Sequence, residues 1–425
     1  MPTALIDEFY QAVISGKTEH WTLLEERAKE CAALRAIICT DHPGAIDLGL
    51  SLGVDSNNCI LPILLGPRAF FISAMTALKG MLQAGRSSVN IDYSLSFDSN
   101  FAEKLKLLIN RGAAGTDKEL LDVESVLMIK AKNKQVQFDI LPFLFENVRL
   151  SRESPSNTRP VDTMVAFRVL DHINWAVYQR SRTFQVDGMS LDTLKEKLRP
   201  DVENVISEFE TSDEFLRHEA TALAIETLLL RLAALWRVPN RDPEVIFGQL
   251  IDFCNLELGF TPLTELSLIW KAISAKAPAP FLGPLLGSPS TMLKKVTGMA
   301  WDIAHLRLLE RLAAQKAFGD FYVPFFVSLD TRWRNLLRLN PIRYMFFDDG
   351  ARMMRSARAD EESFLDICHK AAKQDPKRIL SAEQSAQRRS SVLTLRIEDM
   401  QQLVKKERRR WDRGGDYYHA VADSV

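Results

Sequence analysis

The sequence predicts an α/β fold: a parallel sheet core flanked by helices, with a large helical insertion and a helical C-terminal tail. Residues 91–97 alternate apolar and polar side chains, which is typical of a strand with one buried face. Residues 321–329 form a strongly apolar strand. Helical periodicity fills most of the chain between them. We divide the chain into an N-terminal α/β region (1–90), the first part of the core (91–150), the insertion (151–290), the second part of the core (291–350) and a basic helical tail (351–425).

The individual elements follow from periodicity and from turn residues. After the first core strand, Phe101 to Asn110 has helical spacing and ends at Arg111-Gly112. A second helix is expected over 134–149, followed by a polar loop over 151–160. Further helices are predicted over 165–178, 191–209, 215–236 and 290–315, and in the tail over 352–373 and 393–413.

The composition of the chain limits the classes of function that it can have. The chain has 425 residues, of which 46% are hydrophobic and 26% charged, as in ordinary soluble proteins. Its net charge of −1 means that any contact with nucleic acid needs a local basic patch. Five widely separated cysteines without a C-x-x-C spacing argue against a disulfide scaffold and against structural zinc, and favour a reducing, cytoplasmic compartment.

The sequence indicates neither a signal peptide nor a membrane span. Residues 1–8 carry acids where a signal peptide would be basic. A bilayer-spanning helix needs about 20 apolar residues. The longest candidate, 223–236, is interrupted by Glu226 and Arg231, and is predicted to be a buried helix.

Three aspartates are the candidate functional residues. Asp98 and Asp330 each follow the end of a predicted strand. Ligands of open α/β sheets gather at the carboxyl ends of strands, so these side chains are expected to share one crevice. Asp302 lies in a helix that is apolar on most sides, where an unpaired carboxylate is costly. It therefore needs either a cation or a salt bridge, and Arg307 or a distant lysine is the alternative partner.

Each of these residues also has a purely structural interpretation. Asn100 is a candidate cap for the helix that begins at Phe101, with Glu103 at the third helical position. That cap leaves Asp98 unexplained. Asp330 is a candidate cap for a helix that begins near Arg332. His305 is expected to be a packed or hydrogen-bonded side chain rather than a ligand.

Three segments resemble the PIN-domain metal-dependent ribonucleases, over about residues 91–150 and 290–340. Residues 96–100, SFDSN, resemble the family's first motif, and residues 300–306, AWDIAHL, resemble its D-x-x-H-L helix. Residues 326–333, FVSLDTRW, are similar to its last strand, in which a hydroxyl residue stands two positions before an Asp. The resemblance also implies a Glu on an intervening helix; Glu146 is the first candidate, with Glu219 and Glu226 as competitors. The wide separation of Asp98 and Asp302 requires the helical insertion.

This resemblance implies a metal-dependent nuclease that hydrolyses phosphodiester bonds, with RNA favoured over DNA. Asp98, Asp302 and Asp330 are expected to bind Mg²⁺ or Mn²⁺, and Glu146 to complete the catalytic set. Asn100 is expected to orient Asp98 or the scissile phosphate. Arg332 and Arg334 are expected to contact the substrate. Further expected contacts with nucleic acid are Arg338, Arg343, the cluster 405–413, and the stacking residues Trp333 and Trp411.

Two other function classes remain open. The chain is alternatively a non-catalytic scaffold that binds a protein partner through the helical insertion or the C-terminal tail. The basic residues of the tail are then a solvated helix face or a docking segment. The second alternative is a DNA nuclease or another metal-dependent phosphoesterase, because the same carboxylate chemistry serves all of these substrates.

Overall fold

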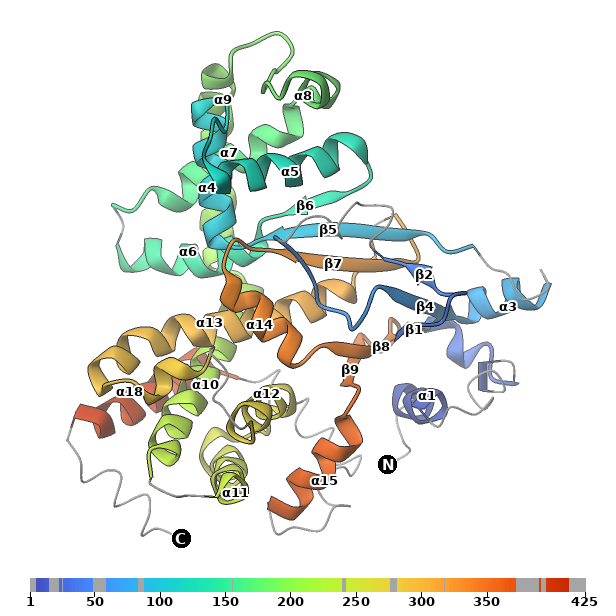
Figure 1. Cartoon of the computed structure of the whole chain (residues 1–425), viewed down its shortest axis with the longest axis vertical. Coiled ribbons are helices and arrows are strands. Elements are labelled where there is room, and N and C mark those ends of the chain that lie inside the picture. Colours follow the sequence, from blue (N-terminus) through green and yellow to red (C-terminus); the bar gives the residue numbers. More distant parts are fainter. Residues whose placement is uncertain are drawn as a thin grey trace.

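The structure is a computed structural model. It describes residues 5–14, 23–24, 26–48, 59–82, 88–154, 156–238, 242–275, 281–316, 318–371, 390 and 395–412. Two sheets lie at the centre, and helices pack around them (Figure 1). The chain is a mixed α/β protein with a parallel sheet portion, as the sequence predicted at this coarse level.

The first sheet contains the two strands that the sequence predicted. Its order is β3 (Ile60–Pro62), β7 (Phe321–Val327), β5 (Ile91–Phe97) and β6 (Gln137–Asp139). Strand β5 runs parallel to both β6 and β7, whereas β3 is antiparallel to β7. All residues of β7 are buried, which explains its unbroken apolar run, because a strand covered on both faces has no polar side.

The second sheet is antiparallel and joins distant parts of the chain. Its order is β2 (Ile46–Asp47), β4 (Arg68–Ser73), β1 (Leu34–Thr40), β8 (Ile342–Asp348) and β9 (Met353–Arg358). Two expectations are corrected here. The N-terminal region is not an α/β unit of its own, because β1 pairs with β8. The segment 352–358, expected to be helical, is strand β9, because pairing with β8 outweighs its local helical pattern.

Three helices follow the first core strand. They are α4 (Ser99–Arg111), α5 (Lys118–Lys132) and α6 (Leu141–Glu153). Helix α4 ends at Gly112, whose φ of 80° is the left-handed conformation that glycine adopts without strain. The helix expected over 134–149 begins later than predicted, because 137–139 pair with β5 as strand β6.

The insertion is helical as predicted over its described residues. It contains α7 (Arg159–Val169), α8 (Trp175–Ser181), α9 (Leu191–Glu210), α10 (Asp213–Trp236), α11 (Pro243–Phe253) and α12 (Leu263–Ile273). The helix expected over 165–178 is broken by a 3₁₀ turn at Leu170–His172. Helix α10 is buried along most of its length. Among the helices that the structure describes, none is long and apolar enough to cross a membrane.

The remaining helices pack either on the sheets or on helices of the insertion (Figure 1). They are α1 (Leu5–Ile14), α3 (Ala74–Leu82), α13 (Pro289–Ala313), α14 (Thr331–Leu339), α15 (Glu361–Ala371) and α18 (Ile397–Asp412). Helix α13 packs against strand β7 and helix α10. It therefore connects the helical insertion to the first sheet.

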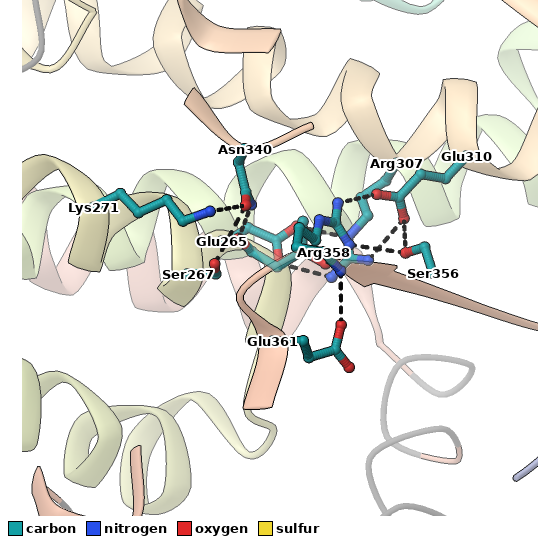
Figure 2. Close-up of polar contacts among 10 residues, drawn as sticks. Glu265, Ser267, Lys271, Arg307, Glu310, Asn340, Ser356, Arg358 and Glu361 are labelled. Atoms are coloured by element: carbon teal, nitrogen blue, oxygen red, sulfur yellow. Dashed lines mark hydrogen bonds and ion pairs between the residues drawn. The ribbon is translucent and has the colours of Figure 1, made fainter. Parts of the chain in front are cut away.

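A buried charged network ties these elements together, and Figure 2 shows its side chains converging. The Arg307 guanidinium donates to both oxygens of Glu265 at 2.8 and 2.9 Å, and to Glu310 at 3.1 Å. Arg358 of β9 donates to Glu310 at 2.5 Å. Both glutamates are almost fully buried, so each needs these arginines to offset the loss of hydration.

The same network holds the end of α14. Asn340, just after that helix, accepts hydrogen bonds from Lys271 at 3.0 Å and Ser267 at 3.3 Å, both on α12 (Figure 2). Its amide also donates to the Thr264 carbonyl at 3.3 Å. Helices α13 and α14 are thus both anchored on α12, and the network sets how these two helices lie relative to each other.

The C-terminal helix α18 docks on the insertion of its own chain. Arg408 donates to Glu226 of α10 at 2.8 Å and to Thr297 of α13 at 2.7 Å. Lys406 pairs with Glu257 at 2.7 Å. Lys406 and Arg408 of the basic cluster expected to contact nucleic acid are therefore engaged in ion pairs within the chain.

We expect Arg408→Ala to destabilise the protein by about 2 kcal/mol, since it removes a charge-assisted hydrogen bond and leaves the buried Glu226 carboxylate without it. The measurement is urea unfolding followed by circular dichroism. Arg409→Ala is the matched control, because Arg409 is exposed on the same helix. Equal midpoints for both variants would contradict the docking role of Arg408.

Candidate functional site

The four predicted acids lie near one another, at the carboxyl ends of two neighbouring parallel strands. Asp98 follows β5 and Asp330 lies three residues beyond β7, and the two strand ends are adjacent because Phe97 pairs with Val327. Asp302 is on α13 and Glu146 on α6. The negative charges of Glu146, Asp330 and Asp98 all raise the pKa of Asp302, so the four carboxylates act on one another as one cluster.

Asp98 is the N-cap of α4. Its carboxylate accepts the Phe101 N–H at 2.7 Å and the Ser328 hydroxyl at 2.5 Å. Burial raises its pKa to about 7, because these two hydrogen bonds only partly offset the loss of hydration and the charges of Glu146 and Asp330. The expectation that Asn100 caps this helix is wrong. The Asp98 backbone is extended at the helix start, whereas Asn100 already lies inside α4 and is exposed.

Asp302 has no compensating partner among the residues that the structure describes. No hydrogen bond or ion pair reaches its carboxylate there, although the side chain is partly buried. The alternative partner Arg307 is wrong, because its guanidinium is taken by Glu265 and Glu310. Burial and the neighbouring acids, above all Glu146, raise the pKa of Asp302 well above its ordinary value, and Arg332 offsets only part of this effect.

Asp330 caps α14, as the structural interpretation expected. Its carboxylate accepts the Arg332 N–H at 2.8 Å, and the Arg332 guanidinium donates to it from Nε at 2.9 Å and from Nη2 at 2.7 Å. The Ser328 hydroxyl accepts the Asp330 N–H at 3.0 Å while it donates to Asp98. Ser328 therefore links the two strand ends. It is the hydroxyl residue of the last motif, and its position in that motif was the signal for this role.

Glu146 is the intermediate acid that lies at the cluster. Its carboxylate accepts the Ser99 hydroxyl at 2.5 Å, and Ser99 in turn accepts the buried Asn147 amide at 2.8 Å. The competitors are engaged elsewhere: Glu219 pairs with Arg152 and Glu226 with Arg408. Sequence reasoning missed the roles of Ser99 and Asn147, and the only available signal was their position beside Asp98 and Glu146.

Several of the predicted substrate contacts are contradicted by the structure. Asn100 is not placed to orient Asp98 as expected, since Ser328 and the Phe101 N–H do so. The two tryptophans expected to stack on bases are buried, Trp333 against Phe326 and Trp411 under the Arg237 guanidinium, so both stacking expectations are wrong. The Arg334 side chain lies outside the described residues. Arg332 and Arg338 are exposed, and Arg343 lies over the Tyr344 ring.

His305 is packed beneath the cluster, as expected. Its ring stacks on His218 with 5.5 Å between centroids, and both rings are buried. Burial lowers the pKa of His305 to about 3 and that of His218 well below its ordinary value, with the charge of Arg311 acting in the same direction on His218. Both imidazoles are therefore neutral, and they contribute no positive charge to the four acids.

Carboxylate oxygens are ligands that suit a hard divalent cation. The four carboxylates of the cluster are, however, not arranged as the ligands of one ion. Among the described residues, no group of three or more His, Cys, Asp or Glu side chains is arranged to hold a metal ion. However, Mg²⁺ usually keeps several waters and binds proteins through one or two carboxylates. The uncompensated Asp302 carboxylate is the feature that fits such an ion, since a buried negative charge without a partner is unfavourable.

Comparison with known proteins finds no matching family model, no matching curated protein and no matching solved structure. The guides to the function are therefore the geometry of the cluster and the sequence motifs.

Proposed function

We propose that this protein is a metal-dependent nuclease, with RNA favoured as its substrate. The single observation that carries the proposal is the Asp302 carboxylate, which is partly buried, lies among three other acids and has no counter-charge of its own in the described structure. Structural acids are normally paired, as Glu265 and Glu310 are in the same helical region. An acid that lacks such a pair, at the carboxyl end of a parallel sheet, is typical of a ligand site.

In the proposed mechanism, Asp98, Asp302 and Asp330 would hold Mg²⁺ or Mn²⁺, either directly or through the ion's own waters, and Glu146 would complete the carboxylate set. A bound ion of this kind activates a water molecule and stabilises charge on the departing oxygen of a phosphodiester. Ser328 holds Asp98 and Asp330 in place, and Ser99 orients Glu146. The preference for RNA comes from the likeness of the three motifs to PIN-domain ribonucleases.

The scaffold alternative has less support. It needs apolar helix faces that are free to bind a partner, but the apolar residues of α10 are buried in the chain's own core and α18 covers this helix. The exposed large apolar residues of the described insertion are scattered singly, at Met189, Val205, Val245, Leu256 and Leu286. The five cysteines are buried and unpaired, which supports the proposed reducing, cytoplasmic location.

The decisive variant is Asp302→Asn, which removes the charge without breaking a described hydrogen bond. We expect wild-type protein to bind Mn²⁺ in calorimetry and to cleave single-stranded RNA only when the metal is present. The variant should lose most of the binding heat and cleave at least about 100-fold more slowly, since it loses electrostatic stabilisation of the transition state.

Asp192→Asn is the matched control, because the Asp192 side chain is 90% exposed on α9. Circular dichroism checks that both variants are folded. Absence of Mn²⁺ binding by the wild type would overturn the proposed function. Metal-dependent cleavage of single-stranded DNA but not of RNA would keep the metal site and replace the substrate.

A further inference from the structure

The Arg332 guanidinium forms an ion pair with one carboxylate of the cluster. It donates to Asp330 from Nε at 2.9 Å and from Nη2 at 2.7 Å. Arg332 is therefore the direct ionic partner of Asp330.

The two partners differ greatly in exposure. The Arg332 side chain is 62% exposed, whereas that of Asp330 is 18% exposed. The guanidinium thus approaches the carboxylates from solvent and is not held by packing. Its loss of contact with Asp330 costs little, because an exposed ion pair contributes about 0–1 kcal/mol. A divalent cation at the same carboxylates carries twice the charge and repels the guanidinium.

We propose that Arg332 is a displaceable counter-cation: it compensates Asp330 in the metal-free protein, gives way when a divalent cation binds, and then contacts a phosphate of the substrate. This inference rests on the proposed function and adds a regulatory role for Arg332 at the same site. The fork of the guanidinium suits phosphate as well as carboxylate, because both present two oxygens to two N–H donors.

The test compares Arg332→Gln with Arg180→Gln, a substitution of an exposed arginine on α8 that has no expected role in substrate binding. Removing the counter-cation should tighten Mn²⁺ binding about tenfold in calorimetry at low ionic strength, because the metal no longer competes with or repels a guanidinium. The same variant should raise the KM for RNA at least about tenfold, because a charge-assisted hydrogen bond to phosphate is lost. Arg180→Gln should change neither quantity.

Opposite changes in metal affinity and substrate affinity distinguish this role from that of an ordinary surface ion pair. Removing such a pair would change neither affinity. Unchanged Mn²⁺ affinity in Arg332→Gln would overturn the proposal. The substitution Arg332→Lys keeps the charge but loses the fork. It should therefore restore the wild-type Mn²⁺ affinity while KM stays raised.

A metal-free measurement keeps this inference separate from the proposed function. If wild-type protein binds no Mn²⁺, the nuclease proposal fails, and a double-mutant cycle of Arg332→Gln with Asp330→Asn decides the compensating role of Arg332. Compensation predicts melting temperatures that are non-additive by about 2 °C at low ionic strength and additive at high salt. Additivity at both salt concentrations would overturn the counter-cation role.

Discussion

Asp98→Asn is expected to stabilise the metal-free protein at alkaline pH. The pKa of Asp98 is raised to about 7 by burial and by the charges of Glu146 and Asp330. A folded-state pKa above the unfolded value means that stability is fully present below about pH 4 and is lost as the pH rises through 7. The asparagine side chain at position 98 does not ionise, so the variant does not lose this stability as the pH rises.

The size of the effect follows from the shift. A rise of about three pKa units corresponds to about 4 kcal/mol at about 1.4 kcal/mol per unit. The loss of a hydrogen bond lowers the stability of the variant by about 1 kcal/mol, because the amide accepts one hydrogen bond where the carboxylate accepts two. We therefore expect the variant to be more stable than wild type by about 3 kcal/mol at pH 8 and no more stable at pH 4.

Urea unfolding between pH 4 and 9, in the presence of a chelator, measures this difference. Asp192→Asn on the exposed face of α9 is the control and should follow the wild-type curve at every pH. An excess of Mg²⁺ should make the wild type more stable than Asp98→Asn at pH 8, since metal binding stabilises only the protein that keeps the Asp98 carboxylate. Parallel pH profiles of wild type and Asp98→Asn would contradict the buried, charge-coupled state of Asp98.

Glu310→Gln is expected to unfold more easily than wild type by about 3–5 kcal/mol at pH 7, because it leaves two arginines without the carboxylate that they share. Glu310 is 1% exposed, and it accepts hydrogen bonds from Arg358, Arg307 and Ser356. Burial alone would raise its pKa, but the charges of Arg358 and Arg307 outweigh burial and lower the pKa. The stabilisation is thus present above the ordinary pKa of about 4.5 and is lost as the pH falls through the lowered value.

The same urea experiment tests this expectation, with Glu196→Gln as the control because Glu196 is exposed on α9. The difference between Glu310→Gln and wild type should shrink as the pH falls below the ordinary carboxyl pKa of about 4.5 towards the lowered pKa of Glu310 in the folded protein. A variant as stable as wild type at pH 7 would show that the network in Figure 2 does not hold α12, α13 and β9 together.

Local sequence pattern predicted the strands β5 and β7 and most of the helices. Strand β5 was predicted, but its single buried face was not found, because Ser94 and Ser96 are buried together with Leu95 and Phe97. The unbroken apolar run over 321–327 reflects burial of the strand itself, which is a local property of the chain. The same holds for the 3.6-residue periodicity of α9 and α10. The positions of Asp98 and Asp330 at strand ends followed directly from these elements.

Strand pairing and compensation of charge were decided by the tertiary structure. Residues 353–358 became β9 only because β8 offers them a hydrogen-bonding edge, and 137–139 became β6 because of β5. Likewise, Glu146 was one of three candidate glutamates, and its place at the cluster depends on how α6 packs. Arg307 is close to Asp302 in sequence, yet its guanidinium forms ion pairs with Glu265 and Glu310.

The sequence by itself determined where each acid stands along its strand or helix, because hydrophobic periodicity and capping act within a few neighbouring residues. It also determined that Asp302 would need a partner. Only the tertiary structure decided which charges meet, because electrostatic compensation depends on distances between residues far apart in the chain. That is why the Arg307 interpretation failed, and why the expected grouping of Asp98, Glu146, Asp302 and Asp330 could be examined only in the packed structure.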